Sequence, residues 1–316
     1  MSVFHDLESK RCFGHRSSVT AVAWNLDGSR LLAAGDASTV LVYDTQSLEM
    51  STRPERHFLH ECHGHTKNIE AMVPSQTSPD MFVTGGVDCL INVYDTRTGS
   101  RAIHSLSTDS KCLFADWAPD GNTVAIGLSS NTIYFVDCLT WTVRKKMPFD
   151  GEVNQFRWTP DGRRILFTRG DGSVDAFAWP SLEHIITVQG HVDTCMGIAC
   201  DPKGRYVSVA SLDTCVSVWD SMSLSNIFTI DRWEKPVQLL DYSYEGQYLA
   251  LTGDLERIDI TDSSNGSLVH SISTVAVLNG FAWHPSRLLL AYAPMKFGRY
   301  GGEQPATYVW GFSRSK

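Results

Sequence analysis

The stretch at residues 190–220, GHVDTCMGIACDPKGRYVSVASLDTCVSVWD, decides how the rest of the chain is interpreted. Short apolar runs alternate in it with residues typical of tight turns, such as Pro202-Lys203-Gly204. Gly and Asp adopt turn backbone angles at low cost, so the pattern predicts strands joined by hairpin turns. Three strands are predicted, over residues 196–200, 206–211 and 216–219.

The same unit recurs along the chain, with a Gly-His head and a Trp-Asp tail in its most regular copy. The middle tails lie 41 or 42 residues apart, and insertions lengthen the first and last intervals to 51 and 49 residues. A period of about 40–45 residues with these marks is the signature of a WD repeat, which forms one four-stranded blade of a β-propeller. The tails end near Asp44, Asp95, Asp137, Ala178, Asp220, Asp262 and Gly311. The sequence therefore predicts an all-β, seven-bladed WD40 β-propeller, with residues 1–316 as a single domain.

Closure of this ring follows from the position of the last tail. Few residues follow Gly311, so the seventh blade lacks its outermost strand. An open sheet edge would be left there, and a propeller avoids such a seam by pairing its two ends. Residues 8–13 are expected to form the missing strand.

A buried polar relay is expected inside the regular blade. Asp213 should accept a hydrogen bond from the His191 ring, whose other nitrogen should meet the Ser211 hydroxyl, and Ser211 should pass a bond to the Trp219 indole. A catalytic His-Asp-Ser triad is the alternative, but the repeat spacing already accounts for these residues. The corresponding positions of other blades are His15, His65, Asp88, Tyr94 and Asp171.

Composition narrows the class of protein. The start of the chain lacks the apolar stretch of a signal peptide, no apolar run is long enough to span a membrane, and none of the eight cysteines forms a C-x-x-C pair. A soluble intracellular protein with reduced cysteines is expected, without contact to membranes. His57, His60, Cys62, His63 and His65 cluster at irregular spacing, which favours a solvated loop over a metal site, so no metal or other cofactor is expected.

The sequence lacks the usual motifs of an enzyme and the usual charge of a nucleic-acid-binding protein. No Gly-x-Ser-x-Gly elbow or phosphate-binding loop is present, so an enzyme with a small-molecule substrate is not expected. The net charge of −8 disfavours the phosphate backbone, and the only tight basic groups are residues 144–146 and 163–164.

The irregular blades carry a family resemblance. The segments are SPDMFVTGGVD (78–88) with INVYDTRTG (91–99), GEVNQFRW (151–158), WPSL (179–182), the Trp-less tail IDITD (258–262), and AWHPSRLLLAYAPMKFGRYGGEQPATYVWGF (282–312). Together they resemble the THO complex subunit 3 family over about residues 13–312. The resemblance implies a nuclear, non-catalytic scaffold in the THO core of the transcription-export (TREX) assembly. Such a subunit docks on the large helical THO subunit and, indirectly, acts with a DEAD-box RNA helicase and mRNA in mRNP assembly and export.

A partner surface is predicted where loops that enter the blades and turns between second and third strands share one face. Its candidates are Lys111, Asn131, Arg169, Trp233, Lys235, Phe297, Arg299 and Tyr300. Trp and Arg are the usual anchors of an interface. Trp233 could instead cover the neighbouring blade, and Phe297 and Tyr300 could pack within their own insertion. A direct single-stranded RNA binder and a WD40 scaffold or histone-peptide reader of another nuclear complex remain alternatives.

Overall fold

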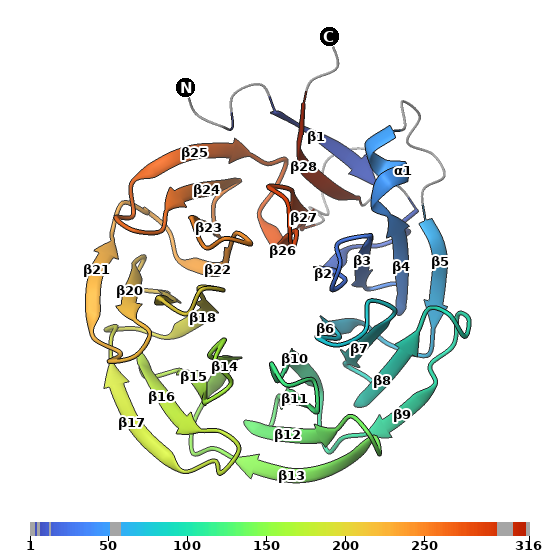
Figure 1. The fold of residues 1–316 in the computed structure, drawn as a ribbon, viewed down its shortest axis with the longest axis horizontal. Coiled ribbons are helices and arrows are strands. Elements are labelled where there is room, and N and C mark those ends of the chain that lie inside the picture. Colours follow the sequence, from blue (N-terminus) through green and yellow to red (C-terminus); the bar gives the residue numbers. More distant parts are fainter. Residues whose placement is uncertain (1–3, 5–6, 13, 51–57, 296–305, 314–316) are drawn as a thin grey trace.

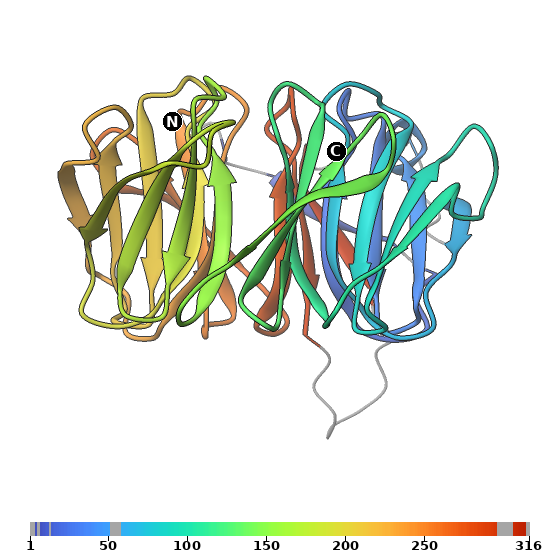
Figure 2. The same cartoon turned by 90° about the horizontal axis from the view of Figure 1, so that it is seen from below.

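A computed structural model describes residues 4, 7–12, 14–50, 58–295 and 306–313. Seven four-stranded antiparallel sheets stand around a central axis (Figure 1). Seen from the side, the ring is a disc with two faces (Figure 2). The predicted seven-bladed β-propeller is confirmed.

Each blade is built outward from the axis. The innermost strands are β2 (Val19–Trp24), β6 (Ile69–Pro74), β10 (Cys112–Trp117), β14 (Val153–Trp158), β18 (Cys195–Cys200), β22 (Val237–Tyr242) and β26 (Leu278–Trp283). The second strands are β3 (Arg30–Gly35), β7 (Met81–Gly86), β11 (Thr123–Leu128), β15 (Arg164–Arg169), β19 (Tyr206–Ser211), β23 (Tyr248–Gly253) and β27 (Leu290–Pro294). The third strands are β4 (Thr39–Asp44), β8 (Leu90–Asp95), β12 (Thr132–Asp137), β16 (Ser173–Ala178), β20 (Val216–Asp220), β24 (Arg257–Asp262) and β28 (Thr307–Ser313). The outer strands are β5 (Phe58–His63), β9 (His104–Ser107), β13 (Thr142–Pro148), β17 (His184–Gln189), β21 (Asn226–Ile230), β25 (Leu268–Ser273) and β1 (Leu7–Cys12).

Burial explains the composition of these strands. Every residue of β11 (TVAIGL) is buried, because a middle strand has a neighbouring blade against each of its faces. Five of the seven residues of β13 (TVRKKMP) are exposed, because an outer strand meets solvent. Strands buried on both faces are nearly continuous apolar runs, and removal of this apolar surface from water supplies most of the stabilisation.

The N-terminal segment closes the ring. β1 pairs antiparallel with β28, from Leu7 opposite Ser313 to Cys12 opposite Thr307, which confirms the predicted closure (Figure 1). Phe4 lies just before this strand and is 1% exposed. Its ring centroid is 4.9 Å from that of Tyr248 in the sixth blade and 5.4 Å from that of Trp310 in the seventh.

A short helix, α1 (Thr45–Met50), adds a second contact between the first and the last blade. This helix was not predicted from the sequence. The Asp44 carboxylate accepts a 2.7 Å bond from the Ser47 N–H and so stabilises the start of α1. Lys10 of β1 donates to the Glu49 carbonyl at 2.7 Å, and Arg287 of the seventh blade pairs with the Glu49 carboxylate at 2.5 Å. The first and last blades are therefore joined through α1 as well as through β1.

Candidate interaction surface

One face of the disc carries the loop that precedes the innermost strand of each blade, which we call the head loop, and we call this side the head face. The turn between the second and third strands is bonded to the head loop of its own blade. Examples are Ser129 N–H to the Lys111 carbonyl at 2.9 Å and Leu212 N–H to the Thr194 carbonyl at 3.0 Å. The two sets of connections thus share one face, as the sequence predicted.

In the fifth blade, the His191 ring joins this turn to the third strand. Its Nδ1 lies 2.9 Å from Asp213 Oδ2, and its Nε2 lies 2.7 Å from the Ser217 hydroxyl. Burial opposes ionisation of Asp213, but bonds from the Cys215 N–H and from His191 outweigh it and lower the pKa of the carboxyl. Both ring nitrogens of a buried histidine are therefore already occupied.

The predicted role of Ser211 in this relay is wrong. Ser211 is the last residue of β19, and its hydroxyl donates to the Asp193 carbonyl at 3.1 Å. Ser217 takes its place because it lies on β20, opposite the histidine ring. Trp219 contributes by packing: it is 1% exposed, and a Cβ on Gly190 would lie 2.3 Å from its ring.

The second blade holds a similar relay. His65 Nδ1 lies 3.0 Å from Asp88 Oδ1, and Nε2 lies 2.7 Å from the Thr84 hydroxyl. Burial lowers the pKa of His65, although Asp88 acts in the opposite direction. Tyr94 stands where the fifth blade has Trp219, and its ring stacks on Phe82 with 4.8 Å between centroids.

Two further predicted relay residues have other partners. His15 in the first blade lies 3.4 Å from the hydroxyl of Thr307, which belongs to the seventh blade, and burial lowers its pKa to about 4. Asp171 does not join a relay; it accepts bonds from the Ser173 N–H at 3.0 Å and hydroxyl at 2.6 Å. A histidine partner is excluded because Phe149 stands at the position of the head histidine.

Aromatic side chains replace the head histidine in the fourth and sixth blades. Phe149 lies four residues before β14 and Trp233 four residues before β22, as His191 lies four residues before β18. The Arg169 guanidinium lies 5.0 Å from the Phe149 ring centroid, and Arg257 lies 4.9 Å from that of Trp233. Such cation–π contacts are attractive through the ring quadrupole.

Each of these arginines also pairs with an aspartate on the third strand of its blade. Arg169 Nη1 lies 3.1 Å from Asp175 Oδ2, and Arg257 Nε lies 3.4 Å from Asp259 Oδ1. We call each set of aromatic ring, arginine and aspartate a head clamp. Trp233 is 3% exposed beneath its arginine, so of its two predicted roles the structure supports packing against the blade rather than an exposed anchor.

The remaining partner candidates differ in accessibility. Lys111 and Lys235 are exposed on the head face. Asn131 is half-buried, has a φ of 56°, and accepts a 3.4 Å bond from the Val153 N–H. The Arg169 side chain is 13% exposed and is held within its clamp. Three candidates lie outside the described residues: Phe297, Arg299 and Tyr300.

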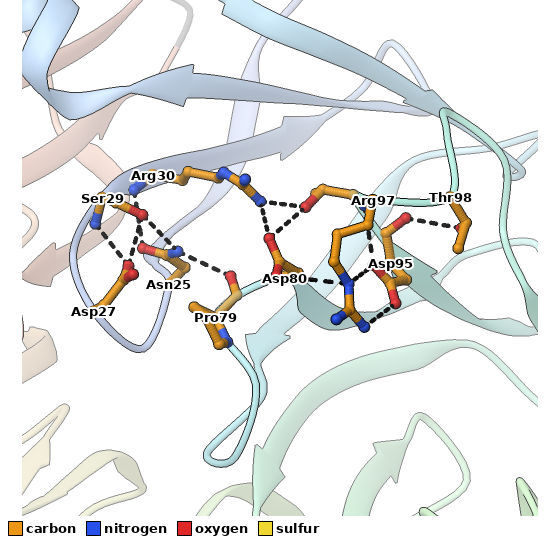
Figure 3. Close-up of polar contacts among 10 residues, drawn as sticks. Asn25, Asp27, Ser29, Arg30, Pro79, Asp80, Asp95, Arg97 and Thr98 are labelled. Atoms are coloured by element: carbon orange, nitrogen blue, oxygen red, sulfur yellow. Dashed lines mark hydrogen bonds and ion pairs between the residues drawn. The ribbon is translucent and has the colours of Figure 1, made fainter.

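On the opposite face, arginines at or just before the start of second strands bind the next blade. Figure 3 shows the pair of blades 1 and 2, where Arg30 Nη1 lies 2.6 Å from Asp80 Oδ1 and Arg97 lies between Asp80 and Asp95. In blade 5, Arg205 donates to the Gly246 carbonyl of blade 6 at 2.9 Å. These charges hold adjacent blades together and are largely neutralised by their partners.

In the part of the chain that the structure describes, no three His, Cys, Asp or Glu side chains gather as a metal site would require. His57 of the predicted cluster lies outside that part, and His65 is engaged with Asp88. None of the described helices has the length and apolar character needed to cross a bilayer.

Comparisons with known proteins agree with this fold. A family model described as "WD domain, G-beta repeat" matches residues 7–44, 56–95 and 182–220, which are the three units that contain a head histidine. The β-propeller domain of Cps50 (Swd1) from Myceliophteria thermophila superposes with a TM-score of 0.82 over 98% of this chain and all of that chain. At 17% identity, that likeness concerns the fold alone.

Two relatives are similar along most of the sequence. WD repeat-containing protein AAC3 of Dictyostelium discoideum is 26% identical over 310 residues, covering 92% of this chain and 64% of that protein. THO complex subunit 3 of Arabidopsis thaliana is 29% identical over 313 residues, covering 99% of this chain and 98% of that protein. The chain is a seven-bladed WD40 β-propeller, and its resemblance to the THO complex subunit 3 family extends over almost its whole length.

Proposed function

We propose that this chain is a non-catalytic scaffold subunit of the THO core of the TREX assembly and acts in the nucleus. The similarity to THO complex subunit 3 over 99% of the chain carries this proposal. A role in assembly agrees with a propeller, which presents loops from seven blades on one rigid disc.

The head-face chemistry supports a structural rather than a catalytic role. The most triad-like group, His191 with Asp213 and Ser217, has a histidine side chain that is 2% exposed. A general base must reach the proton that it abstracts from a substrate, and both nitrogens of His191 already have protein partners. This group serves to hold the head loop in place.

The proposed partner is the large helical THO subunit, and the proposed contact surface is the head face. Lys111 and Lys235 are exposed there, whereas Arg30 and Arg205 on the opposite face bind groups of the next blade. Binding to the helical subunit would link this chain indirectly to a DEAD-box RNA helicase and to mRNA. We place the chain's contribution to mRNP assembly and mRNA export in this docking step.

Capture of the large subunit by the purified propeller tests the proposal. The wild-type protein should retain the subunit, and the double variant Lys111→Glu with Lys235→Glu should bind it about tenfold more weakly. The matched control is Arg163→Glu with Lys203→Glu, which reverses two exposed charges on the opposite face and should bind normally. Failure of the wild-type protein to bind would refute the THO assignment, and weaker binding by the control alone would refute the head face.

A further inference from the structure

The two head clamps differ in their charge balance. In blade 4, one arginine forms an ion pair with one aspartate: Arg169 pairs with Asp175 and also donates to the Asp150 carbonyl. In blade 6, two arginines share one aspartate. Arg257 Nε lies 3.4 Å from Asp259 Oδ1, and Arg232 Nε lies 3.9 Å from Asp259 Oδ2. Arg232 therefore adds a second positive charge beside the blade 6 clamp, and the Asp259 carboxylate neutralises only one of the two.

Several donors at the blade 6 clamp form no hydrogen bond. They are the buried Nη2 of Arg232, the indole Nε1 of Trp233, and the Nε atoms of Arg232 and Arg257, which lie near Asp259 as ion pairs only. Arg232 uses only Nη1, which donates to the Gly266 carbonyl at 2.7 Å. The buried Asp259 carboxylate also accepts a 2.8 Å bond from the Ser271 hydroxyl, so it does not accept a hydrogen bond from each of these donors. Buried donors without partners are costly, so a rotation of the arginine side chains that lets an additional acceptor reach these N–H groups would stabilise this group.

The blade 6 clamp is also more accessible than its counterpart. The Arg232 and Arg257 side chains are 30% and 39% exposed, against 13% for Arg169. Arg232 lies two residues after the end of β21, where blade 5 passes into blade 6, and Arg257 is the first residue of β24 in blade 6. Two neighbouring guanidinium groups bind carboxylates well, because their N–H groups form charge-assisted and bidentate bonds.

We infer that Arg232 and Arg257, of which Arg257 lies over the Trp233 ring, form a subsite for one carboxylate side chain, Asp or Glu, of a protein partner. The inference rests on the proposed docking function and names one contact within it. The exposed Asp231 and Glu256 flank the two arginines in sequence, so the positive charge is confined to the two guanidinium groups and does not extend far enough to hold a polyanion. The site therefore fits a single acidic side chain better than the phosphate run of a nucleic acid.

Titration of the full chain with a short blocked peptide tests this directly. The peptide carries one glutamate among alanines, and its partner peptide carries glutamine instead. The readout is the NMR signal of the Trp233 indole N–H, assigned with Trp233→Phe, because this group lies beneath Arg257. The glutamate peptide should shift the signal to saturation, and the glutamine peptide should not.

Variants separate this subsite from general surface charge. Arg232→Gln should weaken the glutamate peptide about tenfold, which corresponds to about 1.4 kcal/mol, and leaves the Arg257–Asp259 pair intact. Arg257→Gln should weaken it at least as much, and Lys203→Gln on the opposite face should bind normally. The inference is overturned if both peptides shift the signal equally, if Arg232→Gln binds as the wild type does, or if a single-stranded RNA causes the shift and the glutamate peptide does not. Since the THO subunit is absent from this experiment, its outcome is separate from that of the docking test.

Discussion

Truncation of Phe4 to alanine should loosen the seam between the last two blades. The side chain is 1% exposed, and its ring lies against Tyr248 in blade 6 and Trp310 in blade 7. Replacement of a buried phenylalanine by alanine costs about 3–5 kcal/mol. Unfolding of a chain of 316 residues has an entropy near Tm of about 0.7 kcal/mol/K, so a loss of about 4 kcal/mol lowers Tm by about 6 °C.

Calorimetry of Phe4→Ala and two control variants measures this effect. Phe4→Leu keeps most of the apolar volume and should lose less than half as much. Leu139→Ala removes a large apolar side chain that is 81% exposed, so Tm should stay within about 1 °C of the wild type. A Phe4→Ala protein that melts with the Leu139→Ala control would refute the packing of the N-terminal segment into this seam.

Two further predictions concern contacts between blades. Burial lowers the pKa of His15 to about 4, so as the pH falls this histidine is protonated in the unfolded chain before it is protonated in the folded chain. The free energy of unfolding therefore decreases from about pH 6.5 down to pH 4. Between pH 7 and pH 5 the wild type should lose about 2 kcal/mol more than His15→Gln, and equal losses in urea unfolding would contradict this. Asp80→Asn removes the carboxylate shared by Arg30 and Arg97, and because these groups are partly exposed we expect a loss of only about 1 kcal/mol in the same assay. An unchanged urea midpoint would show that this pair contributes nothing to the contact of blades 1 and 2.

Periodicity made the blades predictable because turn residues and apolar runs are local signals. In the regular unit, the predicted strand 206–211 matches β19 at both ends. The pairing of β1 with β28 could also be inferred, since a closed ring leaves one strand without a partner. The helix α1 was not predicted because its capping residue, Asp44, is also the last residue of a blade tail. The WD-repeat pattern already accounts for an aspartate at this position, so it gave no sign of a helix.

The hydrogen-bond partners of the head-loop histidines were less predictable, because they depend on which side chains of adjacent strands face the same loop. Ser211 lies two residues before Asp213 and Ser217 four residues after it, and the strand geometry selects Ser217 for His191. One sequence signal could have identified the head clamps. Trp233 lies at the head-histidine position, four residues before its innermost strand, which predicts a ring packed over the blade rather than an exposed anchor.

Cross-linking of the reconstituted complex with the large helical THO subunit tests the central claim most directly. A lysine-reactive reagent, followed by mass spectrometry, reports which face of the disc lies beside the partner. The account predicts cross-links from Lys111 and Lys235 on the head face. Cross-links to the subunit from Lys203 on the opposite face, with none from Lys111 or Lys235, would contradict it.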